Sequence, residues 1–171
     1  METFKERDWA TRKNGDFFDH SENKFEQHWD GPFAHFGFGA ATEGMATYKM
    51  SPFVSHTPDY IAATSETARP VLVEVQGTGK GGSNNGVITH KFKAKKLECL
   101  GKWNVLDEVT LWLWNDADQT FVWTSYVSVR GMIGRGMASM GTFDGNRPYY
   151  EIPVDLVAEH ADTARLRGKY G

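Results

Sequence analysis

The sequence predicts an α/β fold with a mixed central β-sheet flanked by helices. Three observations lead to this prediction. Residues 71–76 form a run dense in β-branched side chains, which is typical of a buried strand. Residues 109–114 and 120–127 are two further apolar runs, joined by a short segment rich in Asn and Asp that favours a hairpin turn. Between them and the first strand, residues 91–103 have apolar side chains at helical spacing.

The N-terminal part contains one helix signal. Residues 1–20 are polar and mixed in charge, and we expect them to form an arm. Ser21 can cap a helix that ends at the Asp-Gly-Pro segment 30–32. The apolar stripe of this helix includes an acidic residue, because its members are Phe18, Glu22, Phe25 and Trp29. Residues 48–54 are compatible with a strand.

The remaining elements follow the first buried strand. Residues 77–86 are rich in glycine and predict a flexible loop. Residues 128–140 predict a second helix, and residues 149–154 a last extended segment before a polar C-terminal helix. We expect a single domain over residues 1–171, with 128–171 as a C-terminal extension.

Composition excludes several classes of protein. The chain has 171 residues, of which 40% are hydrophobic, so it can bury one core. Its longest strongly apolar run, residues 109–114, is about a third of the roughly 20 residues that a membrane helix needs. The N-terminus is charged where a secretory signal is apolar. Cys99 is the single cysteine, which excludes an intrachain disulfide and a cysteine-rich zinc site. We expect a cytoplasmic protein with no membrane partner.

Charge is distributed unevenly along the chain. The segment 80–102 contains six lysines and one glutamate and therefore carries +5, which leaves −8 for the remainder of a chain with a net charge of −3. This segment predicts a local basic surface, either for a polyanion or simply as the solvated face of a helix.

Two carboxylates stand out against this background. Alternation along residues 71–76 places Leu72, Glu74 and Gln76 on one face of the strand. A buried carboxylate is costly without a cation, a basic partner or water. Asp59 lies fifteen positions earlier, directly after Pro58, and adjacent strands can bring the two acids together around Mg²⁺. In the alternative interpretation Asp59 is a turn residue and Glu74 pairs with a lysine such as Lys93.

Other catalytic motifs are missing from the sequence. The glycine-rich segment around Lys80 lacks the spacing of a phosphate-binding P-loop, and no serine lies in a nucleophile elbow. The six histidines show no zinc-binding spacing, although His56 and His90 can lie near the two acids.

The pair Pro58-Asp59, followed by Glu74-Val75-Gln76, resembles the core motif of the PD-(D/E)XK nuclease superfamily. Within this superfamily, the motif most resembles those of phage-type Holliday-junction resolvases and small phage endonucleases. An acidic helix before the motif and a lysine-rich helix after it extend the resemblance over residues 20–127. The resemblance implies a restriction-endonuclease-like core with the element order αβββαβ.

The resemblance also implies roles for individual residues. Asp59 and Glu74 correspond to the metal-binding carboxylates, and the backbone carbonyl of Val75 to a further oxygen ligand. Glu22 corresponds to the helix glutamate that completes the site, and Glu26, one turn away, is the alternative. The implied cofactor is Mg²⁺, for which Mn²⁺ can substitute.

The last motif position departs from the family, because Gln76 stands where a lysine is usual. Lysine supplies a positive charge to the attacking water and the phosphate, whereas glutamine only forms hydrogen bonds. Either Gln76 positions the water or a lysine from the following helix reaches the site. Lys91, Lys93 and Lys96 are the candidates, and we favour Lys93. Loss of catalysis is the third possibility.

Together these features predict a Mg²⁺-dependent endodeoxyribonuclease that hydrolyses DNA phosphodiester bonds. Branched DNA is one candidate substrate, and a homodimer is expected, in a bacterial host cell if a phage encodes the protein. The alternative is a catalytically inactive DNA-binding or structural protein of the same fold, and a third option is an unrelated α/β binding protein whose Glu74 is only salt-bridged. The lysines expected to contact DNA are Lys80, Lys91, Lys93, Lys95 and Lys96.

Overall fold

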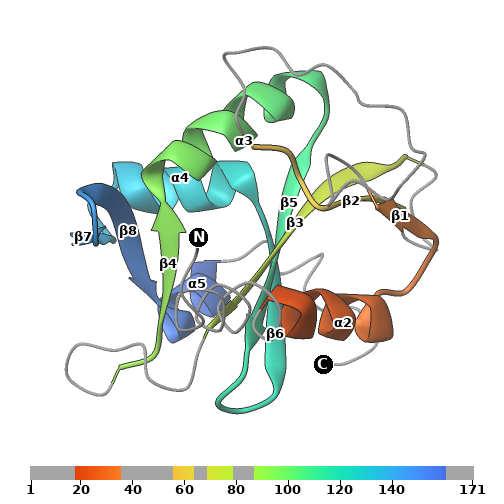
Figure 1. Cartoon of the computed structure of the whole chain (residues 1–171), viewed down its shortest axis with the longest axis horizontal. Coiled ribbons are helices and arrows are strands. Elements are labelled where there is room, and N and C mark those ends of the chain that lie inside the picture. The colour runs from red at the N-terminus through yellow and green to blue at the C-terminus, as the bar shows by residue number, and fades with distance from the viewer. Residues whose placement is uncertain (1–17, 36–55, 64–68, 79–86, 161–171) are drawn as a thin grey trace, which may run out of the picture.

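A computed structural model describes residues 18–35, 56–63, 69–78 and 87–160 (Figure 1). The described elements begin with helix α2 (Phe18–His28) and strands β1 (Phe33–His35), β2 (Tyr60–Ala62), β3 (Val71–Thr78) and β4 (Thr89–Lys93). They continue with α3 (Ala94–Leu106), β5 (Val109–Asn115), β6 (Thr120–Ser125), α4 (Tyr126–Gly134), β7 (Ser139–Phe143), β8 (Arg147–Pro153) and α5 (Val154–His160). None of the described helices is long and apolar enough to cross a membrane.

The main sheet has five strands in the order β1-β2-β3-β5-β6. Strands β3 and β5 are parallel, and the other neighbours are antiparallel, so the sheet is mixed as predicted. The predicted order αβββαβ is present as α2, β1, β2, β3, α3 and β5, with β4 as an additional strand before α3. The hairpin predicted between residues 109 and 127 is also confirmed, because β5 and β6 pair directly.

A second sheet, with the order β4-β8-β7, was not predicted. Two expectations are corrected by it. Residues 91–93 belong to strand β4 rather than to the start of a helix, and the helix expected over residues 128–140 ends at Gly134, before strand β7. In β4 the buried side chains are His90 and Phe92, which alternate with period two. Phe92 also falls on the helical spacing of α3, so periodicity alone did not locate the boundary.

Each face of the five-stranded sheet has its own core. Helices α3, α4 and α5 cover one face, around Leu72, Leu100 and Leu111, and helix α2 covers the other face, around Phe25 and Val73 (Figure 1). Neighbouring residues of β3 therefore point to opposite layers, as alternation predicts. Trp112 and Trp114 pack in the α2 layer, which makes them core residues.

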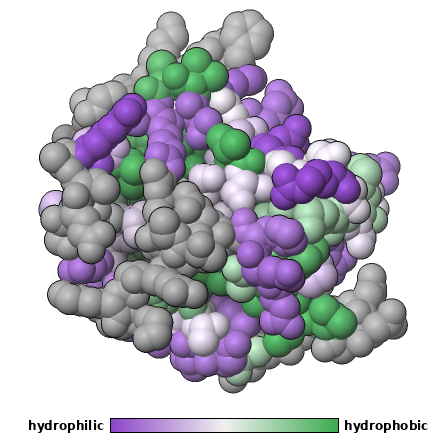
Figure 2. All heavy atoms as spheres, turned by 180° about the vertical axis from the view of Figure 1, so that it is seen from behind, coloured by the Kyte–Doolittle hydropathy of each residue, from purple (hydrophilic) through white to green (hydrophobic). Residues whose placement is uncertain are grey.

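Hydrophobic side chains form separate small areas on the back of the molecule. There, the described hydrophobic side chains lie among hydrophilic ones and leave no broad apolar area in that view (Figure 2). The large apolar side chains with the highest exposed fraction in the described residues belong to Val105 and Leu106 of α3 and to Met140 of β7.

One edge of β3 is only partly paired, because β2 is short. It pairs with β3 only through residues 71–73, with Tyr60 opposite Val73. From Glu74 onward no described strand pairs with β3 on that side, while β5 continues to pair with its other edge as far as Thr78. The backbone of β3 thus has an open edge that begins beside Glu74.

Candidate active site at the open edge of strand β3

Asp59 lies at the beginning of this open edge. It directly precedes β2, and its backbone N–H donates to the carbonyl of Val73, with 2.9 Å between nitrogen and oxygen. Asp59 is a bend residue just outside β2, and Tyr60 opposite Val73 is the last pair of the β2–β3 register. The charge of Glu74 contributes to raising the pKa of Asp59, so the two acids lie within electrostatic reach of each other.

The Asp59 carboxylate takes over a role that a neighbouring strand would otherwise fill. The backbone N–H of Val75 donates to Asp59 Oδ2 over 2.8 Å. Without this acceptor the N–H would lack a partner at the open edge, which is costly for a half-buried amide. The N–H and C=O of one strand residue point to the same side. The Val75 carbonyl therefore faces the same open edge as Asp59.

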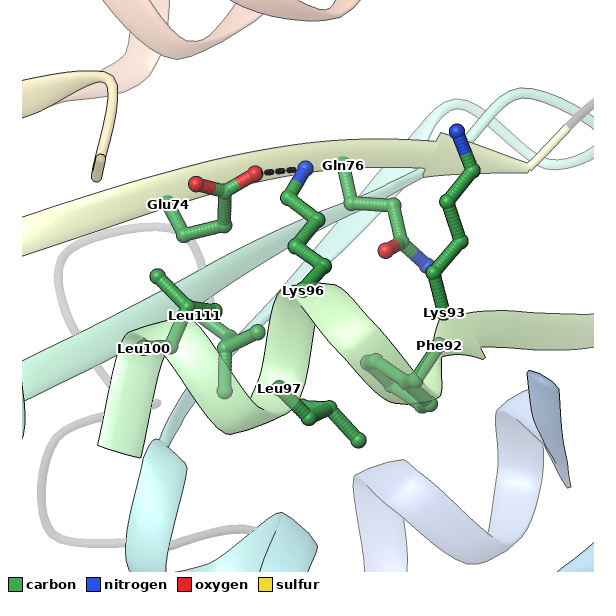
Figure 3. A pocket seen from close by; sticks show the side chains of 8 residues that line it. All are labelled: Glu74, Gln76, Phe92, Lys93, Lys96, Leu97, Leu100 and Leu111. Carbon is green, nitrogen blue, oxygen red and sulfur yellow. Dashed lines mark ion pairs between the residues drawn. The ribbon is translucent and has the colours of Figure 1, made fainter. Parts of the chain in front are cut away.

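Glu74 is a completely buried carboxylate with two basic neighbours. One oxygen, Oε1, forms an ion pair with the ammonium of Lys96 (Figure 3). The other oxygen lies 3.0 Å from Nε2 of His56. His56 is in turn held by Trp103 of α3, whose indole Nε1 donates to the His56 carbonyl over 3.0 Å. Burial of the charge is thus compensated on both oxygens.

The lysine that reaches Glu74 is Lys96, and this differs from the sequence-based preference for Lys93. Lys96 lies in the first turn of α3, and its side chain extends from the helix toward Glu74 on β3 (Figure 3). Lys93 is the last residue of β4 and is exposed. It lines the same pocket, but its side chain extends on the far side of Gln76 from Glu74 (Figure 3).

The pKa values of these groups reflect burial and mutual charge. Burial, followed by the charge of Glu74, raises the pKa of Asp59 to about 8, against the opposing effects of Lys96 and the Val75 hydrogen bond. Burial alone would raise the pKa of Glu74, but Lys96 and His56 together hold it below its ordinary value. Burial would lower the pKa of Lys96, but the charges of Glu74 and Asp59 hold it above its ordinary value. In the metal-free protein Asp59 therefore keeps its proton up to about pH 8, and the Lys96 ammonium balances the charge of Glu74.

The structure separates the two glutamates of α2 that the sequence left as alternatives. The charge of Glu22 contributes to raising the pKa values of both Asp59 and Lys96, which places Glu22 within electrostatic reach of the site. Glu26 is engaged elsewhere: its Oε1 accepts a hydrogen bond from the Tyr60 hydroxyl over 2.7 Å and lies 3.4 Å from Nε2 of His35.

The lysines expected to contact DNA lie in several environments. Lys91 on β4 has its Nζ 5.2 Å from the ring centroid of Tyr149. Lys95 is exposed on α3, where its Nζ is 3.3 Å from Glu98. Lys80 lies outside the described residues, as does the possible strand over residues 48–54.

Whether this site suits a metal depends on its donor atoms. Within the described ranges no group of three His, Cys, Asp or Glu side chains is arranged to hold a metal ion. Asp59 and the Val75 carbonyl lie at the open edge, Glu74 is within electrostatic reach of Asp59, and all three are hard oxygen donors. Mg²⁺ is commonly bound by one or two carboxylates, with water and substrate phosphates as the other ligands. The donor atoms of these residues suit such an ion, which would displace the proton of Asp59 and compete with Lys96 for Glu74.

Two site residues lay beyond what sequence reasoning could identify. His56 was noted only as a histidine able to lie nearby, and Lys96 was one of three candidate lysines. A lysine on a helix can reach a strand carboxylate only if the helix crosses the sheet at the right height, which depends on packing. The available signal was that Glu74, in an apolar strand, requires a positive partner.

Comparisons with known proteins give similarities to solved structures at low sequence identity. The sequence matches no protein-family model and no curated protein. The structure is similar to that of a nuclease from a fusselovirus, with a TM-score of 0.41 and 16% identity over 61% of this chain and 59% of the nuclease. The chain thus spans about three fifths of that nuclease. It is also similar to Hjc, a Holliday junction resolvase from the archaeal hyperthermophile Archaeoglobus fulgidus, with a TM-score of 0.44 and 12% identity over 88% of this chain and 99% of Hjc.

Proposed function

We propose that this protein is a metal-dependent endonuclease that hydrolyses DNA phosphodiester bonds at the open edge of β3. The observation that carries the proposal is the proximity of three charged groups: Asp59, held by the Val75 N–H, is within electrostatic reach of Glu74, and the Lys96 ammonium forms an ion pair with Glu74. Two acids and one lysine at a common site are the groups needed to hold a hard cation and to stabilise negative charge on a phosphate.

Each residue has a role in this proposal. Asp59, Glu74 and the Val75 carbonyl hold Mg²⁺, which when bound supplies Lewis acidity to water and to the phosphate. Lys96 supplies the positive charge that Gln76 lacks, because its ammonium forms an ion pair with Glu74. His56 orients Glu74 through its second oxygen. Gln76 lines the same pocket and can donate a hydrogen bond to water or phosphate.

The basic residues near the site suit a polyanionic substrate. Lys93 lines the Glu74 pocket, and Lys95 is exposed two residues further along the chain, in the first turn of α3. Contacts of this kind with phosphates release counterions, so binding is expected to weaken as salt rises.

The proposal is tested by incubating the full-length protein with plasmid and branched DNA in Mg²⁺, in Mn²⁺ or in a chelator. Cleavage that requires the metal, and that falls by about a hundredfold or more in Asp59→Asn and in Glu74→Gln, supports the enzyme. Glu159→Gln is the matched control, since Glu159 is an exposed acid on α5. Circular dichroism checks that each variant is folded. Cleavage by folded Asp59→Asn at the wild-type rate contradicts the proposed site.

A second candidate is a DNA-binding protein without catalysis. The observation that favours it is the ion pair itself, because Lys96 neutralises Glu74 without any metal. Retention of DNA that weakens with salt, together with no cleavage in Mg²⁺ or Mn²⁺, supports this candidate over the nuclease.

A further inference from the structure

The outer face of the small sheet β4-β8-β7 carries side chains that the candidate active site does not use. Phe92 of β4 and Ile152 of β8 point inward, where both are buried in the core under α3 and α4. Alternation therefore directs Lys91, Lys93 and Tyr149 to the opposite face. This face is defined here as the outer sheet face, and it also includes Arg147 and Phe143, which are directly opposite each other on β8 and β7.

Two aromatic rings lie together on the outer sheet face. The ring centroids of Phe143 and Tyr149 are 4.4 Å apart, and both residues are partly exposed. The Tyr149 ring lies across the backbone of Gly141: a Cβ at this glycine would be 2.4 Å from the Tyr149 hydroxyl oxygen. Because Gly141 has no side chain, the Tyr149 ring can lie directly against the backbone of β7.

Basic side chains lie next to these rings. One acid belongs to the same face: Glu151 is opposite Lys91, is buried, and accepts a hydrogen bond from the Thr89 hydroxyl. Lys91 Nζ is 5.2 Å from the Tyr149 ring centroid, which is within the range of a cation–π contact. Lys93 is opposite Tyr149 across the β4-β8 pair, and Arg147 is exposed beside Phe143. Lys93 also lines the pocket that contains Glu74. The outer sheet face is thus connected to the candidate active site through one residue that belongs to both.

We propose that the outer sheet face binds single-stranded DNA, with unpaired bases stacked on Tyr149 and Phe143 and phosphates next to Lys91, Lys93 and Arg147. Paired bases are stacked inside a duplex and cannot present their faces to the rings, so this combination of aromatic and basic groups suits an unpaired strand. Positive charge around the rings favours a polyanion over an apolar protein partner. The inference builds on the proposed nuclease, because it identifies a single-stranded segment as part of the substrate.

Fluorescence anisotropy in a chelator tests this proposal without cleavage. The probes are a labelled 20-nucleotide oligothymidine and a labelled 20-base-pair duplex. Tyr149→Leu removes the aromatic face but keeps an apolar side chain, and we expect it to weaken single-strand binding about tenfold, with less than a twofold change for the duplex. Tyr149→Phe retains the ring and should bind like wild type. Gly141→Ala, which displaces the ring without removing it, should weaken single-strand binding as well.

Phe121→Leu is the matched control, because Phe121 is a partly buried aromatic residue of β6 that stacks on Trp112 in the α2 layer, away from the outer sheet face. Single-strand binding by folded Tyr149→Leu at wild-type affinity overturns the proposal, and so does an equal loss of single-strand and duplex binding. Sedimentation velocity adds another contrary outcome: loss of a protein dimer in Tyr149→Leu would identify this face as an interface between copies.

The same experiment separates this inference from the proposed nuclease. Anisotropy in a chelator does not depend on catalysis. If the protein never cleaves DNA but Tyr149→Leu weakens single-strand binding, the binding face is supported and the proposed nuclease is not. If the protein cleaves DNA in Mg²⁺ but its Tyr149→Leu variant binds the oligothymidine with wild-type affinity, the nuclease is supported and this binding face is not.

Discussion

The Asp59 carboxylate accepts a hydrogen bond from the backbone N–H of Val75, 2.8 Å away, at the point where strand β2 no longer accompanies β3. This bond explains how a short strand can create a site. Pairing by β2 ends at Val73, so the next outward-facing amide needs an acceptor, and the residue that precedes β2 provides one. The same bond places Asp59 beside Glu74 and beside the Val75 carbonyl.

The identity of the lysine at the site can be tested by paired substitutions. Lys96→Met removes the ammonium that faces Glu74, so we expect the rate of DNA cleavage to fall by about a hundredfold or more. Lys93→Met removes a charge on the far side of Gln76, and a loss of only a few fold is expected. Single-turnover cleavage assays at saturating protein measure both effects. A larger loss in Lys93→Met than in Lys96→Met would restore the sequence-based preference.

The two glutamates of α2 should differ in their effect on cleavage. Glu22→Gln removes a negative charge that acts on Asp59 and Lys96, and we expect slower cleavage and weaker Mn²⁺ binding. Glu26→Gln changes a group that is bound to Tyr60 and His35, and its effect should be on thermal stability. Cleavage rates, measured together with melting temperatures, distinguish these outcomes. Equal cleavage rates in the wild type and Glu22→Gln would exclude Glu22 from the site.

Asp59 should make the metal-free protein less stable as pH rises. Its pKa in the folded protein is about 8, above the ordinary value of 3.8, so the folded state holds this proton more tightly than the unfolded state. The resulting contribution to stability is complete below about pH 3.8 and is lost as pH approaches and passes 8. Between pH 6.5 and 8 in a chelator, the free energy of unfolding should therefore fall more in wild type than in Asp59→Asn. Urea titrations provide the measurement, and parallel curves for the two proteins would contradict the assignment.

His90 should produce the opposite dependence in acid. It is 1% exposed, and neither ring nitrogen has a hydrogen-bond partner in the described part of the chain. Burial lowers the pKa of His90 from 6.5 to about 3, so the folded state binds this proton less readily than the unfolded state. Stability should then decline as pH falls from 6.5 toward 3. In His90→Leu this decline should be smaller, as measured by urea unfolding at pH 7 and pH 4.5. An unchanged decline would show that other groups cause it.

The aromatic core under α2, the helix that carries Glu22, should contribute strongly to the free energy of unfolding. Phe25 is completely buried, and its ring centroid lies 4.5 Å from that of Tyr60 and 5.6 Å from that of Trp112. Phe25→Ala should lower the free energy of unfolding by about 3–5 kcal/mol, because it leaves a large cavity. Phe25→Leu should cost less. Chemical denaturation measures both, and a loss below about 1 kcal/mol in Phe25→Ala would show that α2 is not held by this cluster.

Several features of the protein were determined by its sequence alone. The β-branched run of β3, the turn between β5 and β6 and the acidic residue in the middle of an apolar strand all depend on local patterns, because alternation and turn chemistry act over a few residues. The second sheet could not be recognised in the same way. Phe92 fits both the strand β4 and the helical spacing of α3, and β4 pairs with β8 about sixty residues later.

Tertiary structure decided which basic groups meet the buried acid. The sequence indicates that Glu74 needs a positive partner, but among Lys91, Lys93 and Lys96 it favours Lys93, which is not the lysine that pairs with Glu74. The packing of α3 against β3 directs Lys96 at Glu74, and the early end of β2 places Asp59 and His56 next to them. A local pattern specifies what a buried charge needs. Which side chain supplies it depends on how distant segments pack, because only the folded chain sets those distances.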